Sequence, residues 1–429
     1  MYIGFSKTDI TPEPGLPMAG YVNRKGKSIG AHDSLNARIL YMSSNDDDLV
    51  LISLDLIRVD DNLREKLEAV IMKNYGIKNV IITATHTHSG PEVSLDLWST
   101  RELNESDKKL IVNYLDELTW KINNAIANAV EKSSKVKDIK VISSNIKNVA
   151  TNRIDNKGPI DEEAIILIIE NEYEKTLLLN YACHPTVLGS DNLLYSGDLA
   201  GLTIKYIEES LGVNAMYLNG AAGNISTRFS RSKQDFQEAL NLSKSLANQV
   251  ITGVLSSNAT KLKPIINIGS LNVRLKLKEP ASNEILDELE KQFIDKLVKA
   301  KSEGAPPPIL RALESDVYAI KIAKRRNSIL RNTRSLNIEL KVLTIDKELV
   351  MITFPGELFI GYQLELKQLI KPRKLMLLGY ANGYIGYVPH PNYIGRMCYE
   401  EIVSLLDKIE YYKIKDILSQ LVLGNYPSR

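Results

Sequence analysis

The chain has 429 residues, 44% hydrophobic and 25% charged, so it is long enough to bury a sizeable core and has an ordinary globular composition. Its 54 basic and 52 acidic residues leave a net charge of +2, which gives no reason to expect a nucleic-acid partner. No apolar run approaches the roughly 20 residues of a transmembrane segment. Residues 1–5 lack a basic flank and a long apolar core, so we expect a strand there instead of a signal peptide. The expected location is cytoplasmic, with both cysteines reduced.

Helical patterns alternate with short apolar runs and predict an α/β fold, a mixed β-sheet core flanked by helices. We expect helices over residues 62–75, 105–132, 233–255, 283–301, 309–331 and 358–370. We expect buried strands over residues 79–84, 175–182, 215–218 and 349–354. Residues 305–308, Ala-Pro-Pro-Pro, predict an extended hinge between two of the helices. The charged helix that follows predicts either a solvated face or a lid over an active site.

Histidines and a carboxylate stand just after three of the expected strands. His86 and His88 follow the strand ending at residue 84, His184 follows the strand ending at residue 182, and Glu357 follows the strand ending at residue 354. Alternate side chains of an extended chain share a face, so His86 and His88 would lie together unless a bend makes them diverge. Two histidines and a carboxylate suit a catalytic zinc ion, which keeps one position for water or substrate.

Short motifs in a fixed order continue this pattern along most of the chain. They are Asp9-Ile10-Thr11-Pro12, Ser28 to Asp33, Thr85 to Pro91, Cys183 to Thr186, Ser196 to Gly201, Pro355-Gly356-Glu357 and Tyr387 to Glu400. Together they resemble the catalytic domain of the neutral ceramidases, a family of zinc-dependent amidases. The resemblance implies one large catalytic domain over residues 1–429, with a possible helical insertion around residues 280–332. Because the chain ends soon after the last motif, we expect it to lack the family's C-terminal immunoglobulin-like domain.

The resemblance implies a zinc ion held by His86, His184, Glu357 and Tyr387. Tyr387 is one of three tyrosines in residues 380–388, and it is preferred because the family's metal-binding tyrosine precedes a Val-Thr-Thr step. The step here is Val-Pro-His, a departure from the family pattern. A tyrosine that only packs or hydrogen-bonds at a sheet edge is the alternative for Tyr387.

Four residues are implied to act on the substrate. His88 resembles a histidine that contacts the substrate beside the metal, and it could instead be a ligand. Arg153 resembles the arginine of an Asn-Arg pair whose guanidinium holds a polar substrate group, with a solvated loop cation as the alternative. Tyr399 resembles a substrate-contacting tyrosine. Ser226 aligns with a serine proposed as a nucleophile; a metal-activated water is preferred, and a serine that merely stabilises a turn is the alternative.

Three other residues belong to motifs or loops without a derived chemical role. We expect His32 and Asp198 to orient their neighbours and His390 to be a loop residue. The function expected from all these residues is that of a zinc-dependent hydrolase of an N-acyl, ceramide-like amide in lipid metabolism. A zinc esterase or deacetylase acting on a small soluble substrate, and a metal-binding protein without turnover, are the alternatives. The expected partner is a small-molecule amide, and the sequence gives no oligomeric state.

Overall fold

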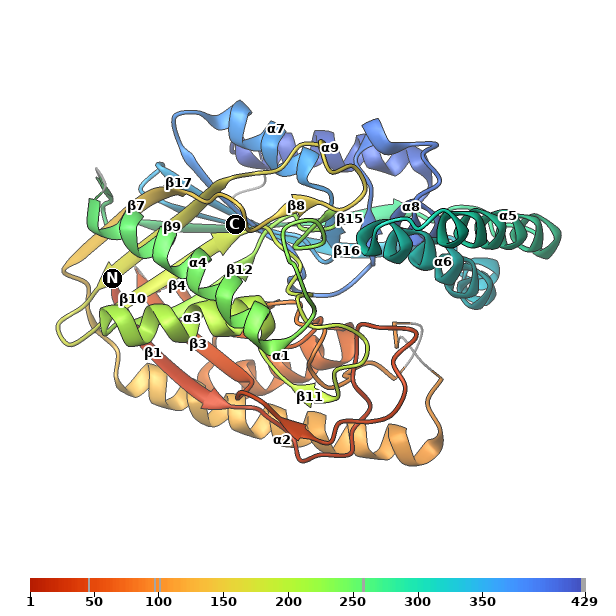
Figure 1. Ribbon diagram of the computed structural model, residues 1–429. Helices are drawn as coiled ribbons and strands as arrows, with labels where there is room; N and C mark the ends of the chain where they lie inside the picture. Colours follow the sequence, from red (N-terminus) through yellow and green to blue (C-terminus); the bar gives the residue numbers. More distant parts are fainter. Residues whose placement is uncertain (45–46, 96–97, 100–101, 257–258, 426–429) are drawn as a thin grey trace.

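Three β-sheets form the centre of the computed structural model, which describes residues 1–44, 47–95, 98–99, 102–256 and 259–425 (Figure 1). The first sheet, in the order β5-β4-β3-β1-β6, comprises β1 (Tyr2–Asp9), β3 (Asn36–Ser44), β4 (Asp47–Leu54), β5 (Asn79–Ala84) and β6 (Ser134–Lys135). The second, in the order β12-β10-β9-β7-β14, comprises β7 (Asp138–Asn145), β9 (Glu163–Glu170), β10 (Lys175–Tyr181), β12 (Asn214–Asn219) and β14 (Thr260–Lys261). The third, in the order β15-β16-β17-β19, comprises β15 (Ile266–Lys276), β16 (Ser335–Ile345), β17 (Leu349–Thr353) and β19 (Lys374–Leu378).

Short strand pairs and helices complete the fold. The pairs are β2 (Gly30–Ala31) with β11 (Leu194–Tyr195), β8 (Thr151–Asn152) with β13 (Ile225–Ser226), and β18 (Glu357–Leu358) with β20 (Tyr387–Val388). The helices are α1 (Asp61–Tyr75), α2 (Glu105–Glu131), α3 (Asp198–Leu211), α4 (Phe236–Ser256), α5 (Asn283–Ser302), α6 (Pro307–Asn332), α7 (Ile360–Ile370), α8 (Tyr399–Val403) and α9 (Lys408–Val422). Among the described residues, no helix is long and apolar enough to cross a membrane.

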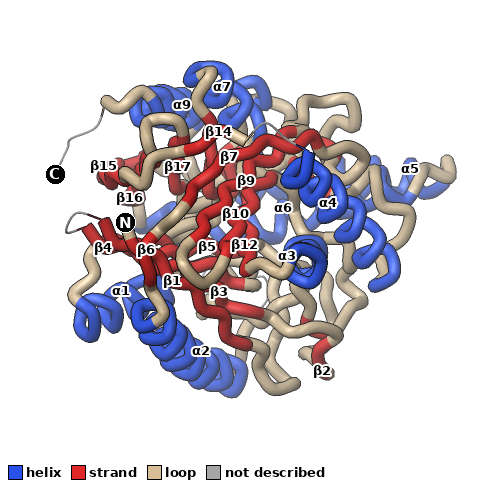
Figure 2. Tube along the Cα trace, turned by 90° about the vertical axis from the view of Figure 1, so that its left-hand side faces the viewer, coloured by secondary structure: helices blue, strands red, loops and turns tan. Residues whose placement is uncertain are grey.

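Strand residues alternate between an inner and an outer core. In β4, Leu49 and Leu51 face an inner core shared by all three sheets, whereas Val50 and Ile52 face the outer core that packs on helices. This alternation follows from the two-residue repeat of a strand, and burial on both faces explains why these strands are almost continuously apolar. Helices α1 and α2 cover the first sheet, α3 and α4 the second, and α7 and α9 the third (Figures 1 and 2).

The carboxyl ends of parallel strands from all three sheets meet in one region. The parallel pairs are β4 with β5, β10 with β12, and β17 with β19. A bridge between Thr83 and Ala381 joins the end of β5 to the segment after β19, and a bridge between His184 and Ser226 joins the segments after β10 and β12. Ligands of open α/β sheets bind at such carboxyl ends, so this region is the natural place for a functional site.

The predicted α/β fold is confirmed, and the expected elements are present with small shifts in their ends. The strand over residues 79–84 agrees with β5, whereas the helix expected from residue 233 begins at Phe236. The predicted break after α5 is also present, but α6 begins at Pro307, because proline suits the first turn of a helix. Helices α5 and α6 pack side by side and project from the body (Figure 1); that they form an insertion stays a prediction.

Candidate metal centre

His86 and His88 meet although the chain bends between them. His86 has a φ of 71°, in the left-handed region that non-glycine residues rarely adopt, and its backbone N–H donates to Leu56 O at 2.9 Å. The bend therefore replaces the extended geometry considered from the sequence. The two Nε2 atoms nevertheless lie 3.2 Å apart, with the ring planes at 83°.

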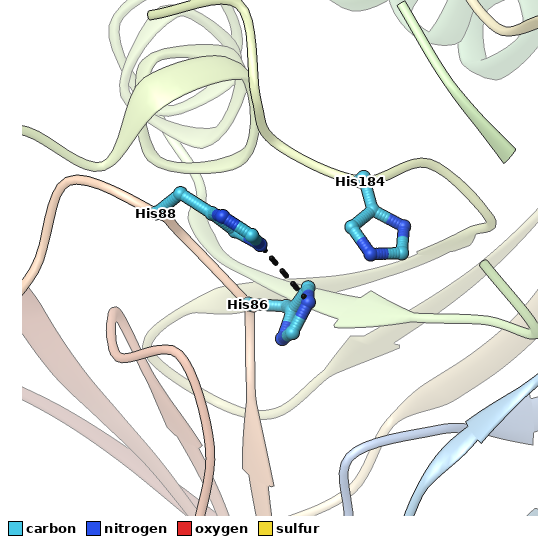
Figure 3. Close-up of side chains that lie close together, drawn as sticks. All are labelled: His86, His88 and His184. Atoms are coloured by element: carbon cyan, nitrogen blue, oxygen red, sulfur yellow. Dashed lines mark hydrogen bonds between the residues drawn. The ribbon is translucent and has the colours of Figure 1, made fainter. Parts of the chain in front are cut away.

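His184, after β10, brings a third imidazole to the same place. Figure 3 shows the rings of His86, His88 and His184 turned toward a common space, and one nitrogen from each lies within 4.8 Å of the other two. All three side chains are buried. Burial lowers the pKa of His88 well below its usual value, and burial together with Arg153 lowers the pKa of His184 to about 3. The two rings are therefore neutral at physiological pH, the form that binds metal.

Backbone carbonyls aim two of the rings. The Nδ1 atom of His86 lies 2.6 Å from Ile57 O, and the Nδ1 atom of His184 lies 2.6 Å from Ala222 O. A carbonyl only accepts, so Nδ1 carries a proton in each ring, and Nε2 is the nitrogen that remains to present a lone pair to a metal ion. Metal-binding histidines commonly donate their other N–H to a backbone carbonyl in this way.

Glu357 places a carboxylate against these lone pairs. Its Oε2 lies 3.0 Å from His184 Nε2 and 3.4 Å from His86 Nε2. The Glu357 side chain is buried with them. Three acceptor atoms thus face one another in a buried place and need a cation between them. Imidazole nitrogen and carboxylate oxygen are ligands that zinc accepts, so these residues fit the predicted ion.

Two tyrosines that the sequence analysis did not select hold Glu357 in place. The Tyr384 hydroxyl donates to Glu357 Oε1, and the Tyr380 hydroxyl lies 3.4 Å from Oε2. Tyr380 also stacks on His86, with ring centroids 4.0 Å apart. The tyrosine-rich segment was a visible signal in the sequence, but the direction of each hydroxyl depends on the left-handed backbone of Tyr380 and the turn that follows it.

Tyr387, the remaining predicted ligand, lies beside Glu357 because β18 and β20 pair these two residues. Arg153 Nη2 donates to the Tyr387 hydroxyl at 3.0 Å, while Arg153 Nε donates to Glu400 Oε1 at 2.7 Å. The Tyr399 ring packs edge-on against Tyr387 with centroids 5.7 Å apart. The structure thus brings Arg153, Tyr387 and Tyr399 together, and metal binding by Tyr387 stays a prediction.

Ser226 is buried close to the centre, in the short strand β13. Its Oγ accepts the backbone N–H of Arg228 at 3.2 Å. Within the part of the chain that the structure describes, no histidine or carboxylate forms a hydrogen bond with this Oγ. A serine nucleophile needs an adjacent base to activate it, so this arrangement favours the structural alternative for Ser226.

The three residues without a derived role lie outside the histidine cluster. Asp198 is buried and accepts the backbone N–H groups of Val187 and Leu188, which fixes the loop that follows His184. His32 is exposed and stacks on Phe236 with centroids 3.9 Å apart. His390 precedes a short 3₁₀ helix (Pro391–Tyr393) and packs edge-on against Tyr362.

A cavity of about 570 Å³ opens over this region. The predicted substrate-contacting residues His88, Arg153, Ser226 and Tyr399 all line it. Helix α6 forms one wall of this cavity, and Asp316 is one of the α6 residues that line it. The four predicted substrate-contacting residues therefore share one chamber with the candidate ligands His86, Glu357 and Tyr387, while His184 is fully buried.

Gly223→Ala is expected to disturb the metal centre directly. A methyl group at Gly223 would lie 2.5 Å from Glu357 O and 2.8 Å from Leu358 O, which forces the backbone carrying Glu357 to move. We expect a loss of about 1–3 kcal/mol in unfolding free energy, as for other overpacked positions, together with weaker zinc binding. Urea unfolding and zinc titration measure the two effects. Gly90→Ala is the matched control, because its methyl group would meet its neighbours at 3.5 Å or more.

We expect the unfolding free energy of the protein to depend on pH through the carboxyl group of Asp316. Burial, with a contribution from Glu400, raises the pKa of Asp316 to about 7 from 3.8. The folded state therefore binds this proton more tightly than the unfolded state. The resulting stabilisation is complete below pH 3.8 and is lost as the pH rises toward 7. Asp316→Asn should flatten the change in unfolding free energy across this window, whereas Asp416→Asn, an exposed change on α9, should not.

The fold and the site are those of an α/β protein with a candidate metal centre, in which buried histidines and a carboxylate gather at the ends of the strands. A family model described as "Neutral/alkaline non-lysosomal ceramidase, N-terminal" matches residues 1–269. The chain therefore belongs to the neutral/alkaline non-lysosomal ceramidase family.

Curated relatives and solved structures agree with this assignment. Neutral ceramidase 2 of Arabidopsis thaliana is 25% identical over 243 residues, which cover 53% of this chain and 31% of that protein. The neutral ceramidase of Mycobacterium tuberculosis is 24% identical over 241 residues, covering 51% of this chain and 37% of that protein. The match thus spans about a third of the curated relatives' length. The crystal structure of neutral ceramidase from Pseudomonas aeruginosa matches with a TM-score of 0.74 at 18% identity, and the match covers all of this chain and 75% of that chain. A ceramidase complexed with C2 matches with a TM-score of 0.75 at 16% identity, and the match covers all of this chain and 76% of that chain.

Proposed function

We propose that this protein is a zinc-dependent amidase that hydrolyses the amide bond of an N-acyl compound. The observation that carries the proposal is the convergence of His86, His184 and Glu357 at one buried point, in a member of a ceramidase family. Zinc held there, with Tyr387 or His88 completing the ligand set, would polarise the amide carbonyl and activate a water molecule. Hydrolysis adds the hydroxyl of water to the carbonyl carbon and a proton to the nitrogen, which releases a carboxylic acid and an amine.

The residues around the ligands position the substrate and supply protons. His88 is neutral and its Nε2 lies 3.2 Å from His86 Nε2, so this atom would accept a proton from the attacking water and then pass it to the departing amine. Arg153 fixes the Tyr387 phenol from one side while Tyr399 packs against it from another. Preorganised hydroxyl and guanidinium donors of this kind stabilise negative charge that develops on a carbonyl oxygen. We prefer water to Ser226 as the nucleophile, because no described base hydrogen-bonds to the Ser226 hydroxyl.

A metal-dependent amidase assay tests the proposal. The protein is stripped with a chelator and then supplied with zinc or with magnesium. Its substrates are a short-chain ceramide, N-octanoylethanolamine and the ester of octanoic acid with ethylene glycol. We expect amide hydrolysis to disappear on chelation and to return with about one equivalent of zinc per chain but not with magnesium. Turnover of the ester alone would replace the amidase with an esterase, and bound zinc without any turnover would leave a metal-binding protein.

A further inference from the structure

Three arginines gather on the wall of the cavity beside the metal centre. Arg228 and Arg231 belong to the loop after β13, and Arg311 lies in the second turn of α6. We call Arg228, Arg231 and Arg311 the arginine cluster. All three line the same cavity as His88, and their side chains are half-buried. Arg153, which lines the same cavity, differs from them because it is paired with Glu400.

The hydrogen-bond partners of the arginine cluster are neutral. Arg228 Nη1 donates to Arg153 O at 3.1 Å, Arg231 Nη1 donates to Thr186 O at 2.5 Å, and Arg311 Nη1 donates to Gln234 Oε1 at 2.8 Å. The Nε atoms of Arg231 and Arg311 are buried and have no hydrogen-bond partner. Across residues 1–44, 47–95, 98–99, 102–256 and 259–425, no carboxylate forms an ion pair with any member of the cluster. Each guanidinium has five N–H donors, so donors remain for a ligand.

Burial disfavours the charged form of all three arginines, and neighbouring cations add to this effect at Arg228 and Arg311. Burial, together with Arg153 and the other members of the cluster, lowers the pKa of Arg228 to about 10. Burial also lowers the pKa of Arg231, and burial together with Arg231 lowers that of Arg311. Burying three neighbouring cations costs free energy that the more distant carboxylates Glu400, Asp198 and Glu314 offset only in part, and an anion bound between the arginines would recover more of it.

The cluster adjoins the reacting centre. The backbone N–H of Arg228 donates to Ser226 Oγ, and Arg231 holds the carbonyl of Thr186, two residues beyond His184. The arginine cluster therefore shares one cavity with the candidate ligands His86 and Glu357. Neutral long-chain amides offer no charge to these guanidinium groups.

We infer that the arginine cluster binds an anionic group of the substrate, a carboxylate or a phosphate, so the substrate is a small N-acyl compound with an acidic group. This inference rests on the proposed amidase function and narrows it to a substrate class. Guanidinium forks match the oxygen geometry of both anions, and charge-assisted hydrogen bonds to them are roughly twice as strong as neutral ones. Arg311 comes from α6, so this helix contributes to substrate selection.

Two matched substrate pairs test the inference. N-octanoylglycine is compared with N-octanoylglycinamide, and N-octanoylethanolamine phosphate is compared with N-octanoylethanolamine. We expect kcat/KM to be at least about tenfold higher for the anionic member of one pair, and the pair with the larger ratio identifies carboxylate or phosphate. Arg311→Gln should lower that ratio about ten- to a hundredfold, and Arg311→Lys should lower it less. Arg331→Gln, which removes the same charge from an exposed position of α6, should leave the ratio unchanged.

The outcomes separate this inference from the proposed function. Equal hydrolysis of both members of each pair, with no change of the ratio in Arg311→Gln, would overturn the inference and keep the amidase. Hydrolysis of no amide at all would overturn the amidase, and calorimetric binding of N-acetylglycine and inorganic phosphate then decides the inference. Binding that Arg311→Gln weakens and Arg331→Gln does not would support it, whereas no binding would overturn it. If Arg311→Gln does not fold, as judged by circular dichroism, Arg228→Gln takes its place.

Discussion

His86→Ala and His184→Ala are each expected to reduce bound zinc from about one ion per chain to about a tenth or less. Each change removes a buried Nε2 that a backbone carbonyl aims at Glu357 Oε2. Catalytic zinc sites usually have only three protein ligands, so losing one removes much of the binding free energy. Amide hydrolysis should fall by at least about a hundredfold, because Lewis-acid stabilisation is worth several kcal/mol. Metal analysis by mass spectrometry and steady-state kinetics measure these effects.

His32→Ala is the matched control for this prediction. His32 is exposed and stacks on Phe236, so its removal should leave metal content and turnover as they are in the parent protein. Circular dichroism verifies that each variant is folded. Full zinc occupancy in both His86→Ala and His184→Ala would show that the ion binds elsewhere.

Outside the apolar core, we expect substitutions that break the Arg153–Glu400 ion pair to lower the unfolding free energy most. Both side chains are at least 92% buried, and Arg153 also donates to the Tyr387 hydroxyl. Arg153→Leu or Glu400→Leu leaves one charge buried without its partner, which costs about 3–5 kcal/mol of unfolding free energy. The double variant should recover much of this loss. Urea unfolding of the four proteins forms a double-mutant cycle.

An exposed ion pair provides the comparison for that cycle. Lys299 and Glu303, near the end of α5, lie 3.9 Å apart with side chains 76% and 63% exposed. Replacing either with alanine should change the unfolding free energy by about 0.5 kcal/mol or less. If Arg153→Leu or Glu400→Leu lowers the unfolding free energy by as little as this, solvent reaches the buried pair.

Local sequence patterns predicted the strands and the residues that follow them. The apolar run over residues 79–84 became β5, and Glu357 lies just after β17 as expected, because burial on both faces leaves a clear apolar pattern. The metal centre itself joins segments about 270 residues apart, which no local pattern describes. The family resemblance supplied that connection, and the structure places Glu357 Oε2 3.4 Å from His86 Nε2 and 3.0 Å from His184 Nε2.

Other features depend on backbone geometry that the sequence does not show. The left-handed conformation of His86 lets its ring face His88 through a bend, where extended geometry had been the basis for placing them together. The hydroxyl groups of Tyr380 and Tyr384 reach Glu357, although only Tyr387 was selected from that segment. The arginine cluster was missed because Arg228, Arg231 and Arg311 become neighbours only when α6 packs over the cavity.

Anomalous diffraction at the zinc absorption edge, from crystals of the zinc-loaded protein, shows whether His86, His184 and Glu357 hold the ion. We predict one peak within about 2.0–2.1 Å of the Nε2 atoms of His86 and His184 and about 2.0–2.2 Å from a Glu357 oxygen. A strong peak elsewhere in the protein, with these three side chains more than about 4 Å from any metal, would show that they are not the zinc ligands.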